Sequence, residues 1–462
     1  MKIIITLIAL SITILSMSDL KAQTVSVSAY KNISDSDNKI INQHIKKYNR
    51  FMVKKNALID SLYRYGKSTF RLDIDAENDW IITIQRNDMR SHDYTSYYTS
   101  DSGTFPDKEF YTPNTYKGKT SNGDIVRLTI DKDNFFGVIL KDEEQKVIRQ
   151  ARDFTGNKKD ESLVIYDNSD YIVSKNKSDY INDALVVPDA GIANLQNSLM
   201  SSELLCTYYL QIATEADYEF YQNYGSIQGA NETILSALNL VEGVYESTFN
   251  LNFIVPFQNV WTTSSDPYSS TDASTLLDQF RSEWNANRTT VTRNIAHLFT
   301  GRNLDNDKAG VAWTGNINND YSYSLSMDYW NMYATLAHEI GHNLNASHPG
   351  ASDCKCGTST ASVMCEGQKD NNLWFCSQSI NSINNFLVNH SSYLTGNIPD
   401  NLTLTGSVTG FNEHRAKIQI TSAQVINSGS TIYKSPTIIL SSDFEVTSGG
   451  VFSAEPLTDC NN

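Results

Sequence analysis

Three of the chain's eight histidines and one glutamate lie within eleven residues, in the segment HEIGHNLNASH from His338 to His348. The surrounding stretch Asn331–Leu344 contains no proline and predicts a helix capped by Asn331. On such a helix His338 and His342 share one face, with their Cβ atoms roughly 5–6 Å apart. Two imidazoles at this spacing can bind one metal ion, and Glu339 lies one step round the helix, where it can act as a base on metal-bound water.

A third ligand at His348 requires the chain to leave the helix sharply after Leu344. Asn345 stands at that point, and asparagine is second to glycine in tolerating the left-handed conformation of such a turn. Three histidines leave a fourth coordination position open, as catalytic zinc requires, whereas a structural zinc site is normally closed by four protein ligands. The segment therefore predicts a catalytic zinc site.

The motif, followed by SVM at Ser362–Met364, resembles the extended zinc motif and Met-turn of the metzincin peptidases. By itself a methionine is more often core filler, and only its position after the motif favours the Met-turn. The resemblance implies a catalytic domain of the α/β (α+β) class, with a twisted mixed sheet and an active-site helix, that acts on proteins or peptides. It also implies one Zn²⁺ ion and the following site residues: the ligands His338, His342 and His348, the general base Glu339 and the underlying Met364.

Further segments resemble the reprolysin or adamalysin branch in a bacterial secreted form, namely Ala296–Trp313, CKCG and WFCS, and Asn114–Ile139 resembles the pro-region of that branch. Two departures concern Asn345, where the branch usually has glycine, and Pro349, where it has aspartate. The SHPG sequence is closer to the serralysin branch, but Glu366 stands where serralysins have a tyrosine, and no glycine- and aspartate-rich repeats follow. The reprolysin-like interpretation is therefore favoured.

The resemblance also places the edge of the sheet beside the cleft at the strand GVAW. An edge strand offers unpaired backbone groups, so an extended peptide can pair with it. The alternative is that the tryptophan of this strand is simply part of the core. The strand contains Gly310, Val311, Ala312 and Trp313.

Six cysteines lie at position 206 or later. The alternative is an all-thiolate zinc site, but an even number of cysteines in an exported chain favours disulfide bonds. The reprolysin pattern implies Cys354 with Cys376 and Cys356 with Cys365, and it leaves the partners of Cys206 and Cys460 open.

The chain is long enough for about three domains. Residues 1–22 have the layout of a secretory signal peptide, and their apolar run is shorter than the roughly 20 residues of a spanning helix, which is the alternative. Residues 23–200 predict a separate β-rich pro-region that ends in a linker at Val186–Glu203. Alternating strands and helices assign the catalytic domain to residues 201–395, and a weak repeat of 20 residues predicts a small β-rich module at 396–462.

The formal charge of −15 argues against nucleic acid as a partner. No membrane span is expected after signal cleavage. The C-terminal module resembles the stacked-strand modules of secreted bacterial enzymes, so it is a candidate for binding a surface or the secretion machinery, with cell-surface attachment as one outcome. Because the pro-region lacks cysteine, an inhibitory role would need a carboxylate, another donor or steric cover, and the alternative is a stable domain that aids folding.

The sequence thus predicts a secreted zinc endopeptidase made as a precursor. The alternatives are an extracellular adhesion or binding protein with a non-catalytic zinc site and an inactive homologue, which the complete set of ligands and base disfavours. Two other features have modest interpretations. His297 lies in an apolar strand and is expected to pack there rather than bind metal. Asp305–Lys308 offers oxygens for Ca²⁺ without the spacing of a known loop.

Overall fold

The computed structural model describes most of the chain, and several expected features fall outside what it describes. These features are the signal peptide, the linker Val186–Glu203, Cys206 and Cys460. Within the described part, no helix has the length and apolar character needed to cross a membrane. The described residues are 25–26, 28–29, 35–73, 79–109, 111–172, 181–185, 207–329, 331–358, 360–367, 372–394, 401–409, 412–416 and 418–455.

The N-terminal region, defined here as the described residues from 35 to 185, contributes most of one large sheet with the strand order β1-β4-β5-β8-β9-β10-β11-β12-β3-β2. Burial alternates along β5, whose even positions point into an apolar core, as the period-2 pattern of DWIITIQ predicts. The strands are β1 Val25–Ser26, β2 Ser28–Ala29, β3 Asn49–Met52, β4 Lys67–Asp73, β5 Asp79–Arg86, β8 Thr115–Thr120, β9 Ile125–Ile130, β10 Phe135–Lys141, β11 Glu144–Gln150 and β12 Leu163–Asp167. The helices are α1 Asp35–Ile41, α2 Lys55–Tyr65 and α3 Arg152–Thr155.

A second sheet, called here the catalytic sheet, has the order β13-β17-β18-β16-β14-β15-β6-β7. It is mixed, because β17 runs antiparallel to β18 while β14, β15, β16 and β18 pair in parallel. Its strands are β6 Arg90–Ser100, β7 Gly103–Pro106, β13 Ile181–Leu185, β14 Tyr208–Ala216, β15 Leu251–Trp261, β16 Ile295–Thr300, β17 Lys308–Trp313 and β18 Tyr323–Met327. The helices of this part are α4 Tyr218–Tyr224, α5 Ile227–Phe249, α6 Ala273–Asn287, α7 Met332–Asn343 and α8 Ser377–Asn389.

Both ends of the catalytic sheet are formed by the N-terminal region. Strand β13 pairs with β17 at one edge, and the hairpin β6–β7 pairs with β15 at the other. The sequence predicted a separate pro-region, but the structure shares a sheet between it and residues 207–394, called here the catalytic unit. Local alternation reveals a strand and not its partner, so this pairing could not be read from the sequence.

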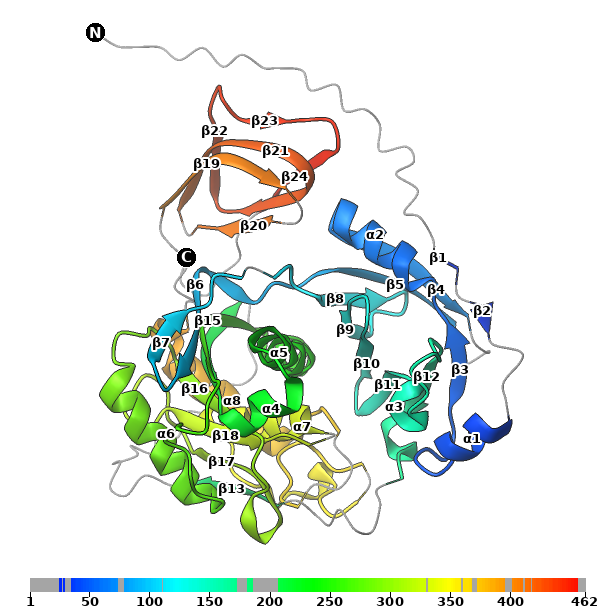
Figure 1. Ribbon diagram of the computed structural model, residues 1–462, viewed down its shortest axis with the longest axis vertical. Helices are drawn as coiled ribbons and strands as arrows, with labels where there is room; N and C mark the ends of the chain where they lie inside the picture. The colour runs from blue at the N-terminus through cyan, green and yellow to red at the C-terminus, as the bar shows by residue number, and fades with distance from the viewer. Residues whose placement is uncertain are drawn as a thin grey trace.

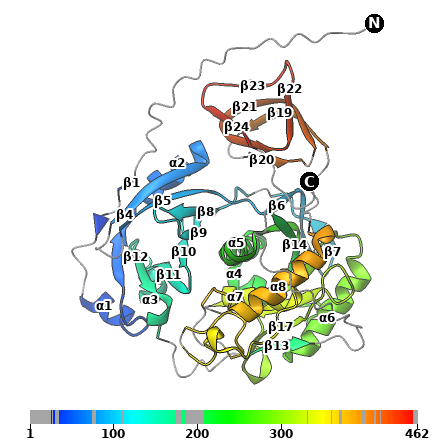
Figure 2. The same cartoon turned by 180° about the vertical axis from the view of Figure 1, so that it is seen from behind.

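Helix α5 lies between the two sheets in both views (Figure 1; Figure 2). It starts at Ile227 and is capped by Ser226, whose hydroxyl accepts a hydrogen bond from the Gly229 N–H at 2.9 Å. Asparagine is a typical N-cap residue, so Asn231 in the segment NETIL predicts the start of this helix, but the structure starts the helix earlier, at Ile227. Asn231 is buried one turn into the helix and donates from Nδ2 to the hydroxyl of Ser96 in β6, at 3.1 Å.

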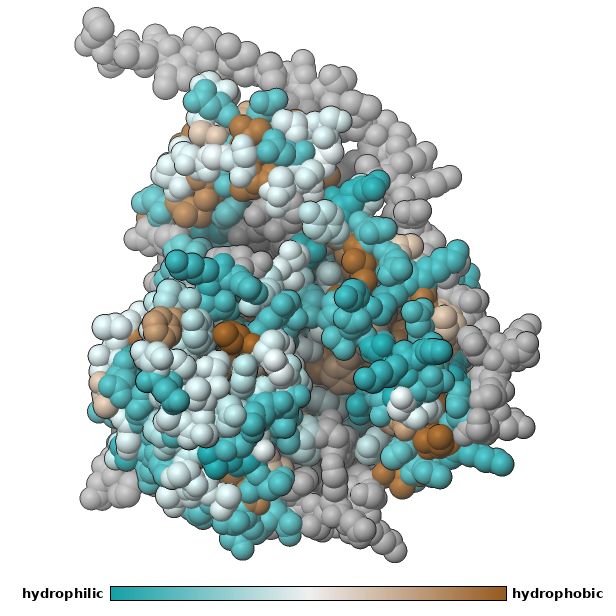
Figure 3. Space-filling model, in the orientation of Figure 1, coloured by the Kyte–Doolittle hydropathy of each residue, from teal (hydrophilic) through white to brown (hydrophobic). Residues whose placement is uncertain are grey.

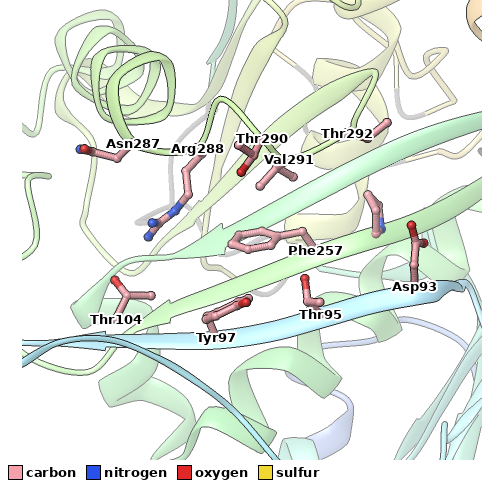
Figure 4. Close-up of a pocket in the computed structure, with 11 residues that line it drawn as sticks. Asp93, Thr95, Tyr97, Thr104, Phe257, Asn287, Arg288, Thr290, Val291 and Thr292 are labelled. Carbon is pink, nitrogen blue, oxygen red and sulfur yellow. The ribbon is translucent and has the colours of Figure 1, made fainter.

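The seam between β6 and β15 is interrupted at Pro256. Proline has no N–H to donate, and the strand register shifts between Val255 and Phe257. A cavity of about 320 Å³ opens there (Figure 4). Arg288, from the loop after α6, points into this cavity towards Tyr97 and Thr104 of the hairpin (Figure 4).

The C-terminal strands all pair in parallel with one long strand, β21. Their registers are offset by about one coil of 18–21 residues, as in Gln419 with Thr437 and Gly429 with Gly450. The last coil exposes the apolar side chains of Ile439, Leu440 and Val451, and apolar atoms are visible on this part of the molecule in Figure 3. The strands are β19 Asn401–Thr409, β20 Asn412–Arg415, β21 Gln419–Lys434, β22 Thr437–Leu440, β23 Glu445–Val446 and β24 Gly450–Glu455.

Candidate metal centre

Helix α7 spans Met332–Asn343, close to the range that the sequence predicted, and all of its residues are buried. Asn331 occupies the N-cap position, but its side chain makes no capping hydrogen bond. Its ψ of 30° lies outside the extended region from which a cap side chain usually reaches the first turn. The helix is therefore held in place mainly by packing on all sides and not by its cap.

The three histidines of the motif converge on one point. His348 Nε2 lies 3.1 Å from His338 Nε2 and 3.2 Å from His342 Nε2. These separations are close to those of nitrogens that share one zinc ion at about 2.0–2.1 Å in a tetrahedral arrangement. The three residues form a group of potential ligands, of which His338 and His342 are fully buried and His348 is half-buried.

Backbone carbonyls orient two of the imidazoles. His338 Nδ1 lies 2.7 Å from the carbonyl oxygen of Val363, and His342 Nδ1 lies 2.6 Å from that of Ala346. Because a carbonyl can only accept, each Nδ1 carries the proton and each Nε2 keeps its lone pair for a metal. Burial, and then the neighbouring imidazoles, hold the pKa of His338 well below its usual value, so this ring is neutral, as a metal ligand must be.

The turn that carries His348 forms as predicted. Asn345 has φ 71°, in the left-handed region, and its N–H donates to the carbonyl of His342 at 2.8 Å. The N–H of Ala346 donates to the carbonyl of Gly341 at 2.9 Å, which closes the end of the helix. The chain then turns back, so that His348 faces the two helical histidines.

Glu339 lies against the strand that was expected to form the substrate edge. A Cβ atom added to Gly310 of β17 would be 2.7 Å from Glu339 Oε1 and 2.6 Å from Thr335 Cγ2, so only glycine fits there. The other residues of the predicted edge, Val311, Ala312 and Trp313, are buried in β17. The outer side of β17 is covered by β13, whose Asn182 pairs with Gly310 and whose Leu185 pairs with Trp313.

Met364, the expected Met-turn residue, lies against Gly341 of α7. It is fully buried, and a Cβ on Gly341 would be 2.3 Å from its Sδ. The expected disulfides Cys354–Cys376 and Cys356–Cys365 both form, and the second contains the residue that follows Met364. The first connects the chain after His348 to the start of α8, and the second closes a loop within that chain segment.

Sequence reasoning missed Asn343, which follows the second histidine. Its buried Nδ2 donates to the carbonyls of Trp313 in β17 and Tyr323 in β18, at 3.0 and 3.1 Å. It thus ties the end of α7 to both β17 and β18. The available signal was an amide on a helix whose residues outside the histidine motif are mostly apolar, because buried amides are nearly always hydrogen-bonded.

The remaining candidates lie apart from the centre. His297 is fully buried in β16, with its ring nitrogens 2.7 and 3.0 Å from the hydroxyls of Ser324 and Ser326, as expected for a packed residue. The carboxylate of Asp305 accepts a hydrogen bond from Thr271 at 2.8 Å, and no group of three potential metal ligands occurs at Asp305–Lys308 in the part of the chain that the structure describes. The carboxylate of Glu366 lies 3.8 Å from His348 Nδ1.

Comparisons with known proteins address the same part of the chain. Residues 207–395 match the reprolysin-type model described as metallo-peptidase family M12. The zinc metalloproteinase-disintegrin-like atrase-A of Naja atra is 28% identical over 155 residues, which cover 32% of this chain and 25% of that protein. These two matches support a reprolysin-like metallopeptidase.

The family implies zinc as the metal and proteins or peptides as substrates, and the histidine group could bind such an ion. The match to the Naja atra protein spans only about a quarter of that protein's length. Among solved structures, one chain titled "Structure of a chaperone-substrate complex" is 14% identical, covers 41% of this chain and 39% of its own, and has a TM-score of 0.33, too low to carry any argument.

Proposed function

We propose that the protein is a secreted zinc-dependent endopeptidase, made as a precursor, in which His338, His342 and His348 hold the ion and Glu339 is the general base. The observation that carries this proposal is the convergence of three imidazoles, in which His348 Nε2 lies 3.1 and 3.2 Å from the other two Nε2 atoms, beside the carboxylate of Glu339 and strand β17. A three-histidine donor set fits a catalytic zinc ion, because it leaves one position open.

The chain's own residues supply positioning and proton transfer. Bound zinc lowers the pKa of water from about 15.7 towards 7 and stabilises negative charge on the scissile carbonyl. Glu339 takes the proton of the attacking water and passes it to the departing amine. Strand β17 pairs with the extended peptide through its backbone once β13 has left, and Asn343 keeps this edge in register with α7.

The pairing of β13 with β17 supports the precursor part of the proposal. Residues that precede the catalytic unit occupy the edge on which a substrate would pair. The latency is therefore steric, in a region without cysteine. Export is supported by the two disulfides, since such bonds persist in oxidising compartments. The C-terminal coils, with their exposed apolar side chains, are the part proposed to attach the protein to a surface or to the secretion machinery.

The rival, a binding protein with structural zinc, differs in its donor count. Among the described residues the group contains three donors and not four, and Met364 packs against the helix beneath them. A closed structural site would need a fourth protein ligand. The donor count therefore favours catalysis.

The test compares Glu339→Ala with the wild type after the N-terminal region has been digested away. We expect equal zinc content by elemental analysis, and a rate on a denatured generic protein that is lower by roughly 10²–10⁴, the usual effect of losing a positioned acid or base. His342→Ala serves as the contrasting variant, because it should lose the metal itself. Wild-type rates in Glu339→Ala, or no cleavage by a folded, zinc-loaded wild type, would contradict the proposal.

A further inference from the structure

The N-terminal region holds the catalytic unit from both edges of one sheet and across one helix. We propose that a single cut in the linker between β13 and β14 does not free the site, and that the N-terminal region stays bound over it as a non-covalent inhibitor until it is itself degraded. This inference rests on the proposed peptidase function for its consequence, and on contacts of the described residues for the binding.

A cut in the linker removes every covalent connection between the two parts. Strand β13 ends at Leu185, and β14 begins at Tyr208. All six cysteines lie at position 206 or later, so no disulfide can tether the N-terminal region after a cut before that position. Whatever holds it afterwards must therefore be non-covalent.

The first set of contacts is at the two sheet edges. Five residues of β13 pair with β17, and the Thr314 N–H donates to the carbonyl of Leu185 at 2.9 Å. At the other edge, buried side chains reinforce the pairing of β6 with β15. Thr99 Oγ1 donates to Asn259 Oδ1 at 3.0 Å, and the Tyr94 hydroxyl donates to Gln258 Oε1 at 2.8 Å.

The second set of contacts lies on α5. Arg127 of β9, 1% exposed, pairs with Glu246 of α5 and lies 3.7 Å from Glu242. Asn87 Nδ2 donates to Asn239 Oδ1 at 2.9 Å and to Glu242 Oε2 at 2.5 Å. Separation of the two parts would break all of these contacts together, and a variant that removes one partner would leave the other charge buried and unpaired.

The third contribution is a shared apolar core. One cluster of buried side chains contains residues of both parts. The N-terminal members include Val138, Leu140 and Tyr166, and the catalytic members include Leu238, Val244 and Tyr333. Apolar burial of this kind is the main source of affinity in obligate interfaces, so the two parts are expected to remain together at low concentrations.

Retention would also keep the site closed. Asn182 pairs with Gly310, the residue against which Glu339 lies. Helix α7 itself contacts β13. An incoming peptide cannot pair with β17 while β13 occupies it, because each edge strand accepts one partner on its open side.

The test uses the full chain with a site for a specific protease inserted between residues 186 and 205. After cutting, we measure co-elution by size-exclusion chromatography, amide hydrogen exchange of Lys308–Trp313, and hydrolysis of a generic peptide. We expect the N-terminal fragment to co-elute, β17 to stay as protected as in the uncut chain, and hydrolysis to rise only after the fragment has been digested. A fragment that separates, or β17 amides that lose protection on cutting alone, would overturn the proposal. So would a cut complex that hydrolyses the peptide at the rate of the digested form.

Two variants test the interface from opposite sides. Arg127→Met removes the buried cation and should weaken retention of the fragment at least about 100-fold. Gly243→Ala lies on α5, where a Cβ would be 2.9 Å from Arg127 Cγ. Alanine favours a helix interior, so this variant should disturb the interface and not the catalytic unit. The exposed Lys132→Met is the matched control and should retain the fragment fully.

The two proposals fail differently in this experiment. If the fragment co-elutes and protects β17 but no hydrolysis appears even after its digestion in the presence of zinc, the peptidase function fails while retention holds. If hydrolysis is strong as soon as the linker is cut, the peptidase function holds and the retained inhibitor does not.

Discussion

The two edges of the catalytic sheet are closed by strands of different kinds. At the β17 edge, β13 contributes five residues and a backbone pairing beside Glu339. At the β15 edge, β6 is eleven residues long, is covered on its outside by β7, and is joined to β15 by buried side-chain hydrogen bonds. The difference indicates two roles for the N-terminal region: β13 blocks the edge beside the candidate metal centre, and β6 anchors the region at the far edge.

The largest effect should come from breaking each pairing with proline. Asp183→Pro with Ala184→Pro removes adjacent N–H groups from β13, so at least one hydrogen bond to β17 is lost. We expect the uncut chain to stay folded, with faster amide exchange in β17 and peptide hydrolysis raised about tenfold or more. Ser96→Pro with Tyr97→Pro in β6 should instead lower the free energy of unfolding, by about 1–3 kcal/mol for each buried backbone group left unpaired.

Both double variants are measured by urea unfolding and by hydrolysis of the same peptide. The comparison of the two edges breaks down if the β13 prolines destabilise the fold as much as the β6 prolines. It also breaks down if only the β6 prolines raise hydrolysis, because the far edge would then control access to the site.

The next largest effect is a loss of stability at low pH, and it comes from His297 in the centre of the catalytic sheet. Burial lowers the pKa of His297 in the fold to about 3, against about 6.5 in the unfolded chain. Below pH 6.5 the unfolded chain takes up a proton that the folded chain refuses, so stability is lost as the pH falls towards 3. The loss is about 1.4 kcal/mol per pH unit, or roughly 3 kcal/mol at pH 4.5.

Asp217 acts in the opposite direction, so the wild type alone cannot isolate His297. Burial raises the pKa of Asp217 to about 7, and its protonation therefore favours the fold as the pH falls below 7. The measurement is the difference in unfolding free energy between the wild type and His297→Gln at pH 7 and pH 4.5. A difference that does not change between these pH values would show that His297 is not held neutral by burial.

The metal centre could be predicted from the sequence because its geometry is local. Residues His338 and His342 are joined by one helical turn, and the left-handed Asn345 returns the chain so that His348 meets them. The helical repeat of 3.6 residues and one turn residue are therefore enough to bring the three imidazoles together. Helix α6 is also specified locally, because its cap Asp272 accepts a hydrogen bond from the Thr275 N–H at 2.8 Å.

The strands that flank the candidate metal centre could not be predicted, because their arrangement depends on pairing between segments that are distant in sequence. Residues 181–185 pair with residues 308–313, more than a hundred positions later, and nothing in INDAL specifies that partner. Residues 90–106 were not recognised as strands, since β6 is polar and partly exposed along its length. A strand that is buried by a partner distant in sequence need not show the alternation of apolar and polar residues by which strands are recognised.

The smallest predicted effect comes from removing one hydroxyl group at the far edge of the catalytic sheet. Thr99→Val keeps the shape of the side chain and removes the hydroxyl that donates to Asn259. The expected loss is about 1 kcal/mol of unfolding free energy, the usual net value of one hydrogen bond. In a double-mutant cycle with Asn259→Ala, the two losses should be less than additive, because both remove the same bond. Retention of the N-terminal fragment after cutting should also be weaker in Thr99→Val than in the wild type. If the cycle is instead additive and retention is unchanged, the side-chain bonds of β6 contribute nothing at the far edge, and attachment of the N-terminal region must come from the apolar core around α5.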